Sequence, residues 1–355
     1  MGVIACKKGK PTRRTLLRAG LAWAVAPSLC RAGRSETAGP RPDRTLVLLH
    51  LSGGNDGLNT LIPCADPLYY ELRPRLGRVA RDVVAVNNRV GFHPSLSALV
   101  PLYERGSLAV VQGVGYPDPD YSHVGSCQIW ATGTTETSCP RGWWDGVLRR
   151  LPNRSQHLAV WVGDEAPTVM ATASPARVSV ADGRGDTPNS GKNPAGYRPG
   201  QIEKTLATIA RLVASPHPPS LVFAAMGGFD THADQLEAHE EVLRKLGDGL
   251  AAFQRELEWR AVAERVVLMA WSEFGRRPAE NATGGTDHGA AGPVLLLGKK
   301  IRGGLYGTMP SLEDTDFGNL TASVDFRTVY AVLAERWLGC SAGAAAGLRA
   351  SLPIL

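Results

Sequence analysis

Short motifs that mark several common enzyme classes are missing from this sequence of 355 residues. There is no G-x-S-x-G elbow, no P-loop and no H-E-x-x-H pattern, which argues against serine esterases, nucleoside triphosphatases and zincin proteases. There is also no C-x-x-C pair, so a structural zinc bound by cysteines is not expected. The chemistry of the chain must therefore come from residues that lie far apart in the sequence.

Acidic residues are absent from positions 1–32, which hold seven basic residues. The rest of the chain has 32 basic and 33 acidic residues, so the net charge of +6 belongs to its start and does not indicate a nucleic-acid partner. Arg13 and Arg14 precede an apolar run, 16–27, that is too short to span a bilayer. The pattern predicts a twin-arginine signal peptide over residues 1–32, with an amphipathic anchoring helix as the alternative.

A twin-arginine leader implies recognition by the bacterial export machinery and a periplasmic or secreted protein without an integral membrane span. Cleavage after Ala32 leaves four cysteines, which are Cys64, Cys127, Cys139 and Cys340. Four cysteines in an oxidising compartment allow three pairings, and the sequence does not choose among them.

Apolar runs and helical periodicities alternate through the rest of the chain. Strands are expected at 46–51, 108–113, 158–162, 221–226, 266–270 and 293–297, and helices at 94–103, 201–214, 236–259 and 325–338. This alternation predicts an α/β fold with a doubly wound, mostly parallel sheet and helices on both faces. We expect a flexible lead-in at 33–44 and a single domain at 45–355, with an inserted loop or lid at about 174–199.

Four predicted strands end in polar clusters. Asp56 follows the first, Ser122 and His123 follow the second, Asp230 and His232 come after 221–226, and Glu273 comes after 266–270. In open α/β sheets, ligands bind outside the carboxyl ends of the strands, so we expect these clusters to converge. The alternatives are structural, because Asp56, Asp230 and Ser122 are all suited to capping a helix or a turn.

The types of side chain in these clusters suit a metal ion. Asp230 and His232 pair a hard oxygen with a borderline nitrogen, and Asp287 and His288 repeat that pairing before the last strand. A solvated turn is the alternative for the second pair. His239 follows farther along and is expected at the surface.

Two arginines follow Glu273 directly. Arg276 and Arg277 would bind phosphate or sulfate oxygens bidentately if they lay beside a metal, although a salt-bridge network with Glu273 is an equally ordinary use. Ser122 is the candidate nucleophile. On an extended segment His123 would point to the opposite face and need not be the base for Ser122, and a metal could activate the serine instead.

The ordered set of motifs resembles a bacterial, twin-arginine-exported family known as domain of unknown function 1501, which has no settled activity. The motifs are Gly53–Thr60, His93–Pro94, Ser122–His123, Gly228–His232, Ser272–Arg277, Gly285–Gly289 and Asp325–Arg327. The family is in turn distantly similar to the alkaline phosphatase and sulfatase superfamily. That resemblance implies metal-dependent hydrolysis of a small anionic ester. By position, Asp56 resembles a first-strand metal ligand and Ser122 the nucleophile.

The resulting hypothesis is a metal-dependent phosphate or sulfate ester hydrolase. Asp56, Asp230, His232, Glu273 and His288 would bind zinc or manganese, with magnesium as a further candidate, and Asn55, His93, His123 and Asp287 are additional candidates. One departure favours an alternative. The superfamily usually has an Asp-His pair where this chain has Glu273-Phe274, and phenylalanine cannot bind a metal. The alternative is therefore an exported binding or envelope-assembly protein that keeps the fold without the activity.

Overall fold

The computed structural model describes residues 43–135, 142–151, 159–163, 178–180, 201–341 and 351–355. The predicted signal peptide, Cys139 and most of the predicted loop at 174–199 lie outside these residues. All of these described residues belong to one compact unit. None of the helices among the described residues is both long and apolar enough to cross a membrane.

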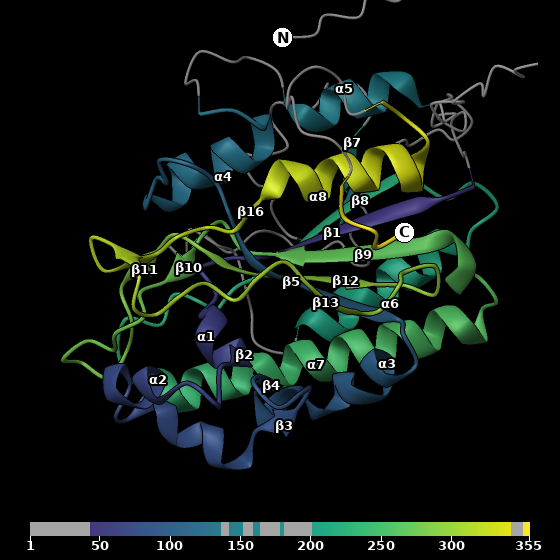
Figure 1. The fold of residues 1–355 in the computed structure, drawn as a ribbon. Coiled ribbons are helices and arrows are strands. Elements are labelled where there is room, and N and C mark those ends of the chain that lie inside the picture. The colour runs from purple at the N-terminus through teal and green to yellow at the C-terminus, as the bar shows by residue number, and fades with distance from the viewer. Residues whose placement is uncertain (1–42, 136–141, 152–158, 164–177, 181–200, 342–350) are drawn as a thin grey trace, which may run out of the picture. The chain divides into compact units, whose positions relative to one another are not determined.

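A nine-stranded sheet forms the centre of the fold, in the order β13-β5-β12-β9-β1-β8-β6-β7 with β16 also paired to β5 (Figure 1). The strands are β1 Thr45–Leu51, β5 Leu108–Gly115, β6 Ala159–Trp161, β7 Val178–Val180, β8 Leu221–Met226, β9 Val266–Trp271, β12 Gly292–Leu297, β13 Gly304–Tyr306 and β16 Val324–Asp325. β1 and β5 are buried along their whole length, because a strand covered on both faces carries apolar residues continuously.

All pairings in this sheet are parallel except the two made by β12. The chain returns from β9 to β12 through a hairpin of two short strands, β10 (Gly275–Arg276) and β11 (His288–Gly289), and not through a helix. A connection without a crossover gives an antiparallel neighbour. The start of β12 therefore lies at the same edge of the sheet as the ends of β1, β5, β8 and β9.

One face of the sheet is covered by α4 (His123–Thr132), α5 (Trp143–Arg150) and α8 (Phe326–Val332), which lie above the sheet in Figure 1. Their contact with the sheet is rich in aromatic rings. Trp130 stacks between Trp271 and Phe326, with ring centroids 4.5 and 4.2 Å apart. Stacked rings of this size bury much apolar area, so this layer fixes α4 firmly over the end of β9.

The opposite face is covered by α6 (Gln201–Val213), α7 (Gln235–Trp259), a 3-10 helix η2 (Pro94–Leu99) and α3 (Val100–Glu104). In α7, Leu243, Leu246 and Leu250 are fully buried, as their spacing of three and four residues predicts. Each such leucine contributes roughly 2 kcal/mol from apolar burial. This helix therefore anchors the chain that follows β8.

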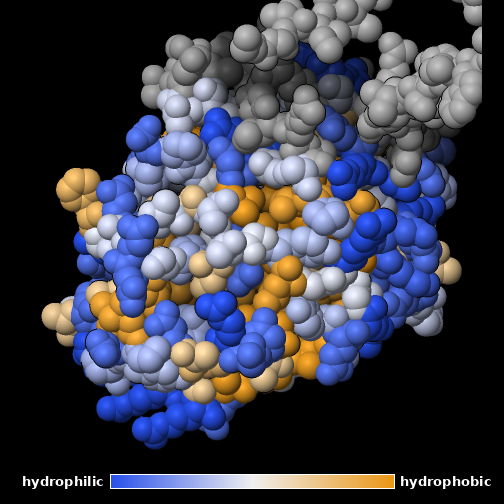
Figure 2. All heavy atoms as spheres, viewed as in Figure 1, coloured by the Kyte–Doolittle hydropathy of each residue, from blue (hydrophilic) through white to orange (hydrophobic). Residues whose placement is uncertain are grey.

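Smaller elements surround these layers. They are α1 Gly57–Thr60, β2 Leu61–Ile62, α2 Pro67–Leu72, η1 Leu76–Asp82, β3 Val84–Ala85, β4 Gly91–Phe92, η5 Ala263–Arg265, β14 Thr315–Asp316, β15 Asn319–Leu320 and the π-helix η6 Leu333–Leu338. Figure 2 shows hydrophobic side chains in the middle of one face of the molecule and mostly hydrophilic ones along its lower rim. Such interleaving is ordinary, because polar groups cannot cover a whole protein surface.

The predicted α/β fold is confirmed, and each of the six expected strands is present within two residues of its predicted ends. Several details differ. Residues 178–180 form edge strand β7 inside the predicted loop, and the expected helices at 94–103 and 325–338 each divide into two helical types. The prediction that His239 lies at the surface is wrong, since it is 1% exposed on the inner face of α7.

Candidate metal centre

Polar side chains from five segments meet at the edge where β1, β5, β8 and β9 end and β12 begins. The loops after β1 and β8 approach each other so closely that a Cβ on Gly53 would lie 2.3 Å from the Asp230 nitrogen. Gly53 and Gly54 also have positive φ angles of 124° and 76°, which favour glycine. The glycines after β1 therefore permit the close packing of this edge.

Three histidines surround the Asp230 carboxylate. Its oxygens lie 3.1 Å from His232 Nε2, 3.4 Å from His288 Nε2 and 3.5 Å from His123 Nε2. His232 Nε2 and His288 Nε2 are themselves 2.9 Å apart. We call these four residues the outer cluster. Their side chains are between 20% and 50% exposed, so the cluster is open to solvent.

The opposite ring nitrogen of each histidine faces an oxygen. His123 Nδ1 lies 2.7 Å from Glu273 Oε1, and His288 Nδ1 lies 2.7 Å from the Tyr121 carbonyl oxygen. His232 Nδ1 lies 3.7 Å from Asp287 Oδ1, longer than a hydrogen bond. Because a carbonyl oxygen only accepts, His288 donates from Nδ1, and its neutral ring keeps a lone pair on Nε2. Histidines that bind metals are oriented in this way by an oxygen behind the ring.

The electrostatics of Asp230 and His288 suit a metal ion, whereas the hydrogen bond with Glu273 raises the pKa of His123. Burial lowers the pKa of His288, which keeps the ring neutral and its lone pair available. Burial alone would raise the pKa of Asp230, but the Arg276 guanidinium beside it holds the pKa below the usual value. The cluster thus offers an ionised carboxylate with imidazole nitrogens around it, a donor set typical of zinc and related ions.

Glu273 lies behind the outer cluster and is 1% exposed. Its Oε1 accepts hydrogen bonds from Gly53 N at 2.9 Å and from His123 Nδ1, and its Oε2 lies 2.9 Å from His50 Nε2. Burial would raise its pKa, but the charge of His50 and the two histidine hydrogen bonds hold the pKa well below the usual range. Glu273 therefore orients His123 and is not itself part of the outer cluster.

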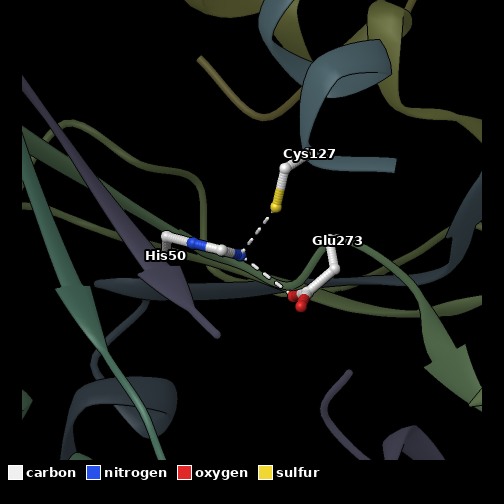
Figure 3. Close-up of side chains that lie close together, drawn as sticks. All are labelled: His50, Cys127 and Glu273. Carbon is white, nitrogen blue, oxygen red and sulfur yellow. Dashed lines mark hydrogen bonds and ion pairs between the residues drawn. The ribbon is translucent and has the colours of Figure 1, made fainter. Parts of the chain in front are cut away.

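The Glu273 side chain also belongs to a second group, which we call the inner cluster: His50, Cys127 and Glu273. The three side chains come from β1, α4 and the segment after β9 and point toward one another (Figure 3). His50 Nε2 lies 3.9 Å from Cys127 Sγ. Burial opposes charge on His50, but its interactions with Cys127 and Glu273 raise its pKa to about 10.

Helix α4 brings its residues to Glu273 along one face. His123 and Cys127 are four residues apart, and between them Ser126 donates to the Glu273 carbonyl oxygen, as does Trp130 Nε1 at 2.9 Å. Residues spaced by three, four and seven share one face of a helix. The helix was not expected from the sequence, and neither His50 nor Cys127 was among the candidate ligands. A histidine inside the apolar run 46–51 and the His-x-x-x-Cys spacing are the signals that could have indicated them.

Phe274 is 4% exposed and packs against two rings of the outer cluster, with centroids 4.9 Å from His123 and 4.4 Å from His288. Phe274, which cannot bind a metal, thus forms an apolar wall behind two imidazoles. His123 brings a further nitrogen to the same place from α4.

Arg276 is buried and its guanidinium is fully engaged. It donates to the carbonyl oxygens of Gly54 and Thr286, both at 2.7 Å, and of Gly53 and Phe229, and to Asp230 Oδ1 at 2.6 Å. An arginine that ties together four carbonyl oxygens is not free to bind a substrate. Arg277 is exposed beside Asp287, whose carbonyl oxygen accepts from the Arg277 nitrogen at 2.9 Å.

Ser122 is the N-cap of α4, where its hydroxyl accepts from Gly125 N at 3.5 Å. Ser122 therefore has the helix-capping role that was the alternative to a nucleophile. The residue is exposed and directly precedes His123, so it lies next to the outer cluster.

Asp56 does not join either cluster. It caps α1, is fully buried, and forms an ion pair of 2.7 Å with Arg73, which is also fully buried. Gln235 donates to the same carboxylate. As a correction to its expected role as a metal ligand, the structure gives Asp56 a set of partners that leaves no oxygen open to the outer cluster.

Two further candidates are also held inside the fold. Asn55 Oδ1 accepts from His239 Nε2 at 3.0 Å, and His93 Nδ1 accepts from Ser95 N at 3.1 Å as the cap of η2. Burial lowers the pKa of His93 to about 4 and that of His239 to about 3. Both rings are therefore neutral structural groups that support the packing of α7 against η2.

Residues 152–332 match a family described as a protein of unknown function, DUF1501. This is just over half of the chain, and the chain belongs to this family. The match includes Asp230, Glu273 and His288, whereas the motifs at 53–60 and 122–123 lie before it. A search of curated proteins found no match.

Among solved structures, the chain is similar to a protein in the alkaline phosphatase superfamily from Vibrio parahaemolyticus, with 10% identity, a TM-score of 0.49 and coverage of 90% of this chain and 72% of that one. It is also similar to the lipoteichoic acid synthase LtaP from Listeria monocytogenes (9%, 0.45, 85% and 73%). A third is the C-terminal periplasmic domain of EcEptC from Escherichia coli in complex with zinc (13%, 0.44, 74% and 74%).

Proposed function

We propose that this DUF1501 protein is an exported, metal-dependent hydrolase of a phosphate or sulfate ester. One observation carries the proposal. Three imidazoles turn their Nε2 atoms to the Asp230 carboxylate, while the Nδ1 atom of each faces an oxygen behind the ring. Hydrogen-bonded pairs of surface residues do not require this shared orientation, whereas a metal centre does.

His123, Asp230, His232 and His288 would hold the ion. Imidazole nitrogens with one carboxylate suit zinc best and manganese next, while magnesium prefers sites of oxygen alone. When bound, the ion would act as a Lewis acid on a phosphoryl or sulfuryl oxygen. This ligand set revises the one expected from sequence, since His123 replaces Asp56 and Glu273 moves behind the ligands.

The other residues of the edge have separate roles in this proposal. Arg276 fixes the Asp230 carboxylate, and Glu273 fixes the ring of His123. Arg277 is the exposed cation that would attract the anionic ester, in place of the buried Arg276. Ser122 would attack the ester, because it is exposed and adjoins His123.

The setting of the reaction follows from the sequence. A twin-arginine leader over residues 1–32 would be read by the bacterial export machinery and would place the enzyme in the periplasm or outside the cell. The substrate would be a small anionic ester. We propose no nucleic-acid partner, because the basic charge of the chain belongs to the leader.

The alternative is a binding or envelope-assembly protein that keeps the metal without turnover. Two observations favour it. Phe274 occupies the position of an expected ligand, and Arg276 is committed to backbone carbonyl oxygens. Both leave the edge with fewer polar groups for a substrate than a working esterase of this type would be expected to use.

The test compares two histidines. The full chain is stripped with a chelator, reloaded with zinc or manganese, and assayed with 4-nitrophenyl phosphate, bis(4-nitrophenyl) phosphate and 4-nitrophenyl sulfate. We expect turnover that disappears in His288→Ala and persists in His217→Ala, since His217 is an exposed residue before β8, at the other end of that strand. Ser122→Ala should lose turnover and retain the metal.

The outcomes separate the two functions. Bound metal without turnover on any of these esters would support the binding protein. If the reloaded chain holds no metal in proportion to protein, or if His288→Ala binds and turns over like the unaltered chain, the hydrolase proposal fails.

A further inference from the structure

The inner cluster consists of three side chains that bind metals, and it is separate from the outer cluster in its ligand atoms. His50, Cys127 and Glu273 each contribute one such atom, and these atoms lie within 4.8 Å of one another (Figure 3). His50 comes from β1 and Cys127 from the middle of α4. Two regular elements therefore hold the group, and ligands on rigid elements keep their geometry.

The spacing of the ligand atoms is close to that of a tetrahedral zinc site. Zinc bonds of about 2.1 Å to nitrogen and oxygen and about 2.3 Å to sulfur would separate the nitrogen from the oxygen by about 3.4 Å and from the sulfur by about 3.6 Å. The observed separations are 2.9 Å for His50 Nε2 to Glu273 Oε2 and 3.9 Å for His50 Nε2 to Cys127 Sγ. Shifts of about half an ångström would bring these two separations to zinc geometry, and the Glu273 oxygen and Cys127 Sγ lie within 4.8 Å of each other.

The surroundings fix two of the three side chains. His50 stacks on Trp271 with ring centroids 4.4 Å apart, which directs its Nε2 edge at the other two residues. The Glu273 carboxylate is held on its other oxygen by Gly53 N and His123 Nδ1. His50 and Glu273 are 8% and 1% exposed, so the buried carboxylate requires a positive charge beside it.

A proton on His50 Nε2 is one source of that charge, and it would make the group a plain ion pair. However, a single N–H cannot point at both a carboxylate oxygen and a sulfur atom. A metal ion can bond to all three atoms at once, and it displaces the Nε2 proton to solvent when it binds.

We propose that the inner cluster is a second metal site, selective for zinc and other soft divalent ions. Its thiolate excludes manganese and magnesium, whereas the outer cluster, which has no sulfur ligand, accepts zinc or manganese. The two sites are linked because Glu273 touches His50 through Oε2 and His123 through Oε1. The inner site does not depend on the proposed hydrolysis, and measurements of metal binding alone can test it.

Cobalt provides a direct test, since a thiolate bound to Co²⁺ gives an intense charge-transfer absorption that imidazole and carboxylate ligands do not give. The full chain, stripped of metal, is titrated with Co²⁺ and separately with Zn²⁺ and Mn²⁺. We expect the thiolate band, two zinc ions per chain and one manganese ion per chain. Cys127→Ser should lose the band and bind one zinc ion. His288→Ala should also bind one zinc ion but keep the band.

Two controls cover a thiol outside the clusters and a failure to fold. Cys64→Ser should keep the band, because this thiol donates to the Arg89 carbonyl oxygen outside both clusters. If Cys127→Ser does not fold, alkylation of the unaltered chain replaces it: zinc should slow the reaction of Cys127 with iodoacetamide at least tenfold and leave that of Cys64 unchanged.

The inner site is overturned if the unaltered chain shows no thiolate band, if Cys127→Ser retains the band, or if zinc does not protect Cys127 from alkylation. A chain that has the band but hydrolyses no ester would keep the inner site and lose the hydrolase function. A chain that hydrolyses esters but lacks the band would keep the hydrolase function and overturn the inner site.

Discussion

Asp56 and Asp230 are two aspartates at the same edge of one sheet, in the loops that follow the adjacent strands β1 and β8. The Asp56 side chain is fully buried against Arg73, whereas the Asp230 side chain is 50% exposed among three imidazoles. Both have pKa values below the usual one, and in both an arginine contributes to the shift. The difference is what else each carboxylate touches, so a low pKa alone does not identify a functional carboxylate.

Their arginines are engaged in a similar way, and the two pairs differ in the burial of the aspartate. Arg73 donates once to Asp56 at 2.7 Å, once to Asn59 at 2.5 Å, and to the carbonyl oxygens of Pro278 and Arg277. Arg276 donates once to Asp230 and otherwise to carbonyl oxygens, but the Asp230 side chain stays 50% exposed whereas that of Asp56 is fully buried. One pair therefore stabilises the fold, and the other leaves a carboxylate free to accept further ligands.

The largest expected effect is on the stability that the buried ion pair of Asp56 and Arg73 provides. Arg73→Ala leaves the buried Asp56 carboxylate without its cation, which should lower the free energy of unfolding by about 3–5 kcal/mol. Urea denaturation measures this change. Arg244→Ala is the matched control, because its contact with Asp248 is exposed and 3.9 Å long, and it should change the free energy of unfolding by less than about 1 kcal/mol. A loss as small as that of the control would show that Asp56 is not sealed by Arg73.

The second prediction compares the same substitution at the two aspartates by its effect on metal binding. Asp230→Asn should weaken manganese binding at the outer cluster by about 100-fold or more, since removing even a residue that only supports a ligand costs 10- to 100-fold. Manganese titration reads this site alone if the inner cluster excludes manganese. Asp56→Asn makes the same chemical change and should leave manganese affinity within about twofold while lowering stability. Equal losses of affinity in both variants would contradict the distinction.

The third effect is the pH dependence of the stability that Asp56 and Arg73 provide. Burial would raise the pKa of Asp56, but Arg73 and its other partners hold it below 3.8 in the folded chain. The pair therefore contributes its full stability above about pH 4 to 5, and this contribution is lost as the pH falls through the folded-state pKa. In acid, the free energy of unfolding should fall more steeply for the unaltered chain than for Asp56→Asn, which cannot titrate. Parallel acid profiles of the two proteins would show that this carboxylate is not the group responsible.

The edge of the sheet and most residue types of the outer cluster were predictable from the sequence. Asp230, His232 and His288 follow or precede apolar runs, and the loops at the carboxyl ends of parallel strands meet. The direction of β12 was not predictable, because the sequence of the 20 residues between β9 and β12, 272–291, does not reveal whether they form a hairpin or a crossover.

The partners of each carboxylate could not be predicted at all. Arg73, the C-cap residue of α2, donates to Asp56. Glu273 contacts His123, which lies 150 residues away in the sequence. Such contacts depend on how helices settle on the sheet, and α4, which carries His123 and Cys127, has no amphipathic pattern strong enough to be recognised. The distinction between a closed and an open aspartate therefore exists only in the folded chain.

The smallest expected effect concerns the residue behind His232. Asp287 Oδ1 lies 3.7 Å from His232 Nδ1, a longer contact than those behind His123 and His288. Asp287→Asn should therefore weaken manganese binding by no more than about tenfold, at the low end for a residue that orients a ligand. The exposed Asp248→Asn serves as the control and should leave affinity unchanged. If Asp287→Asn abolishes binding as Asp230→Asn does, Asp287 is itself a ligand, and the cluster around Asp230 includes the residue that directly precedes β11.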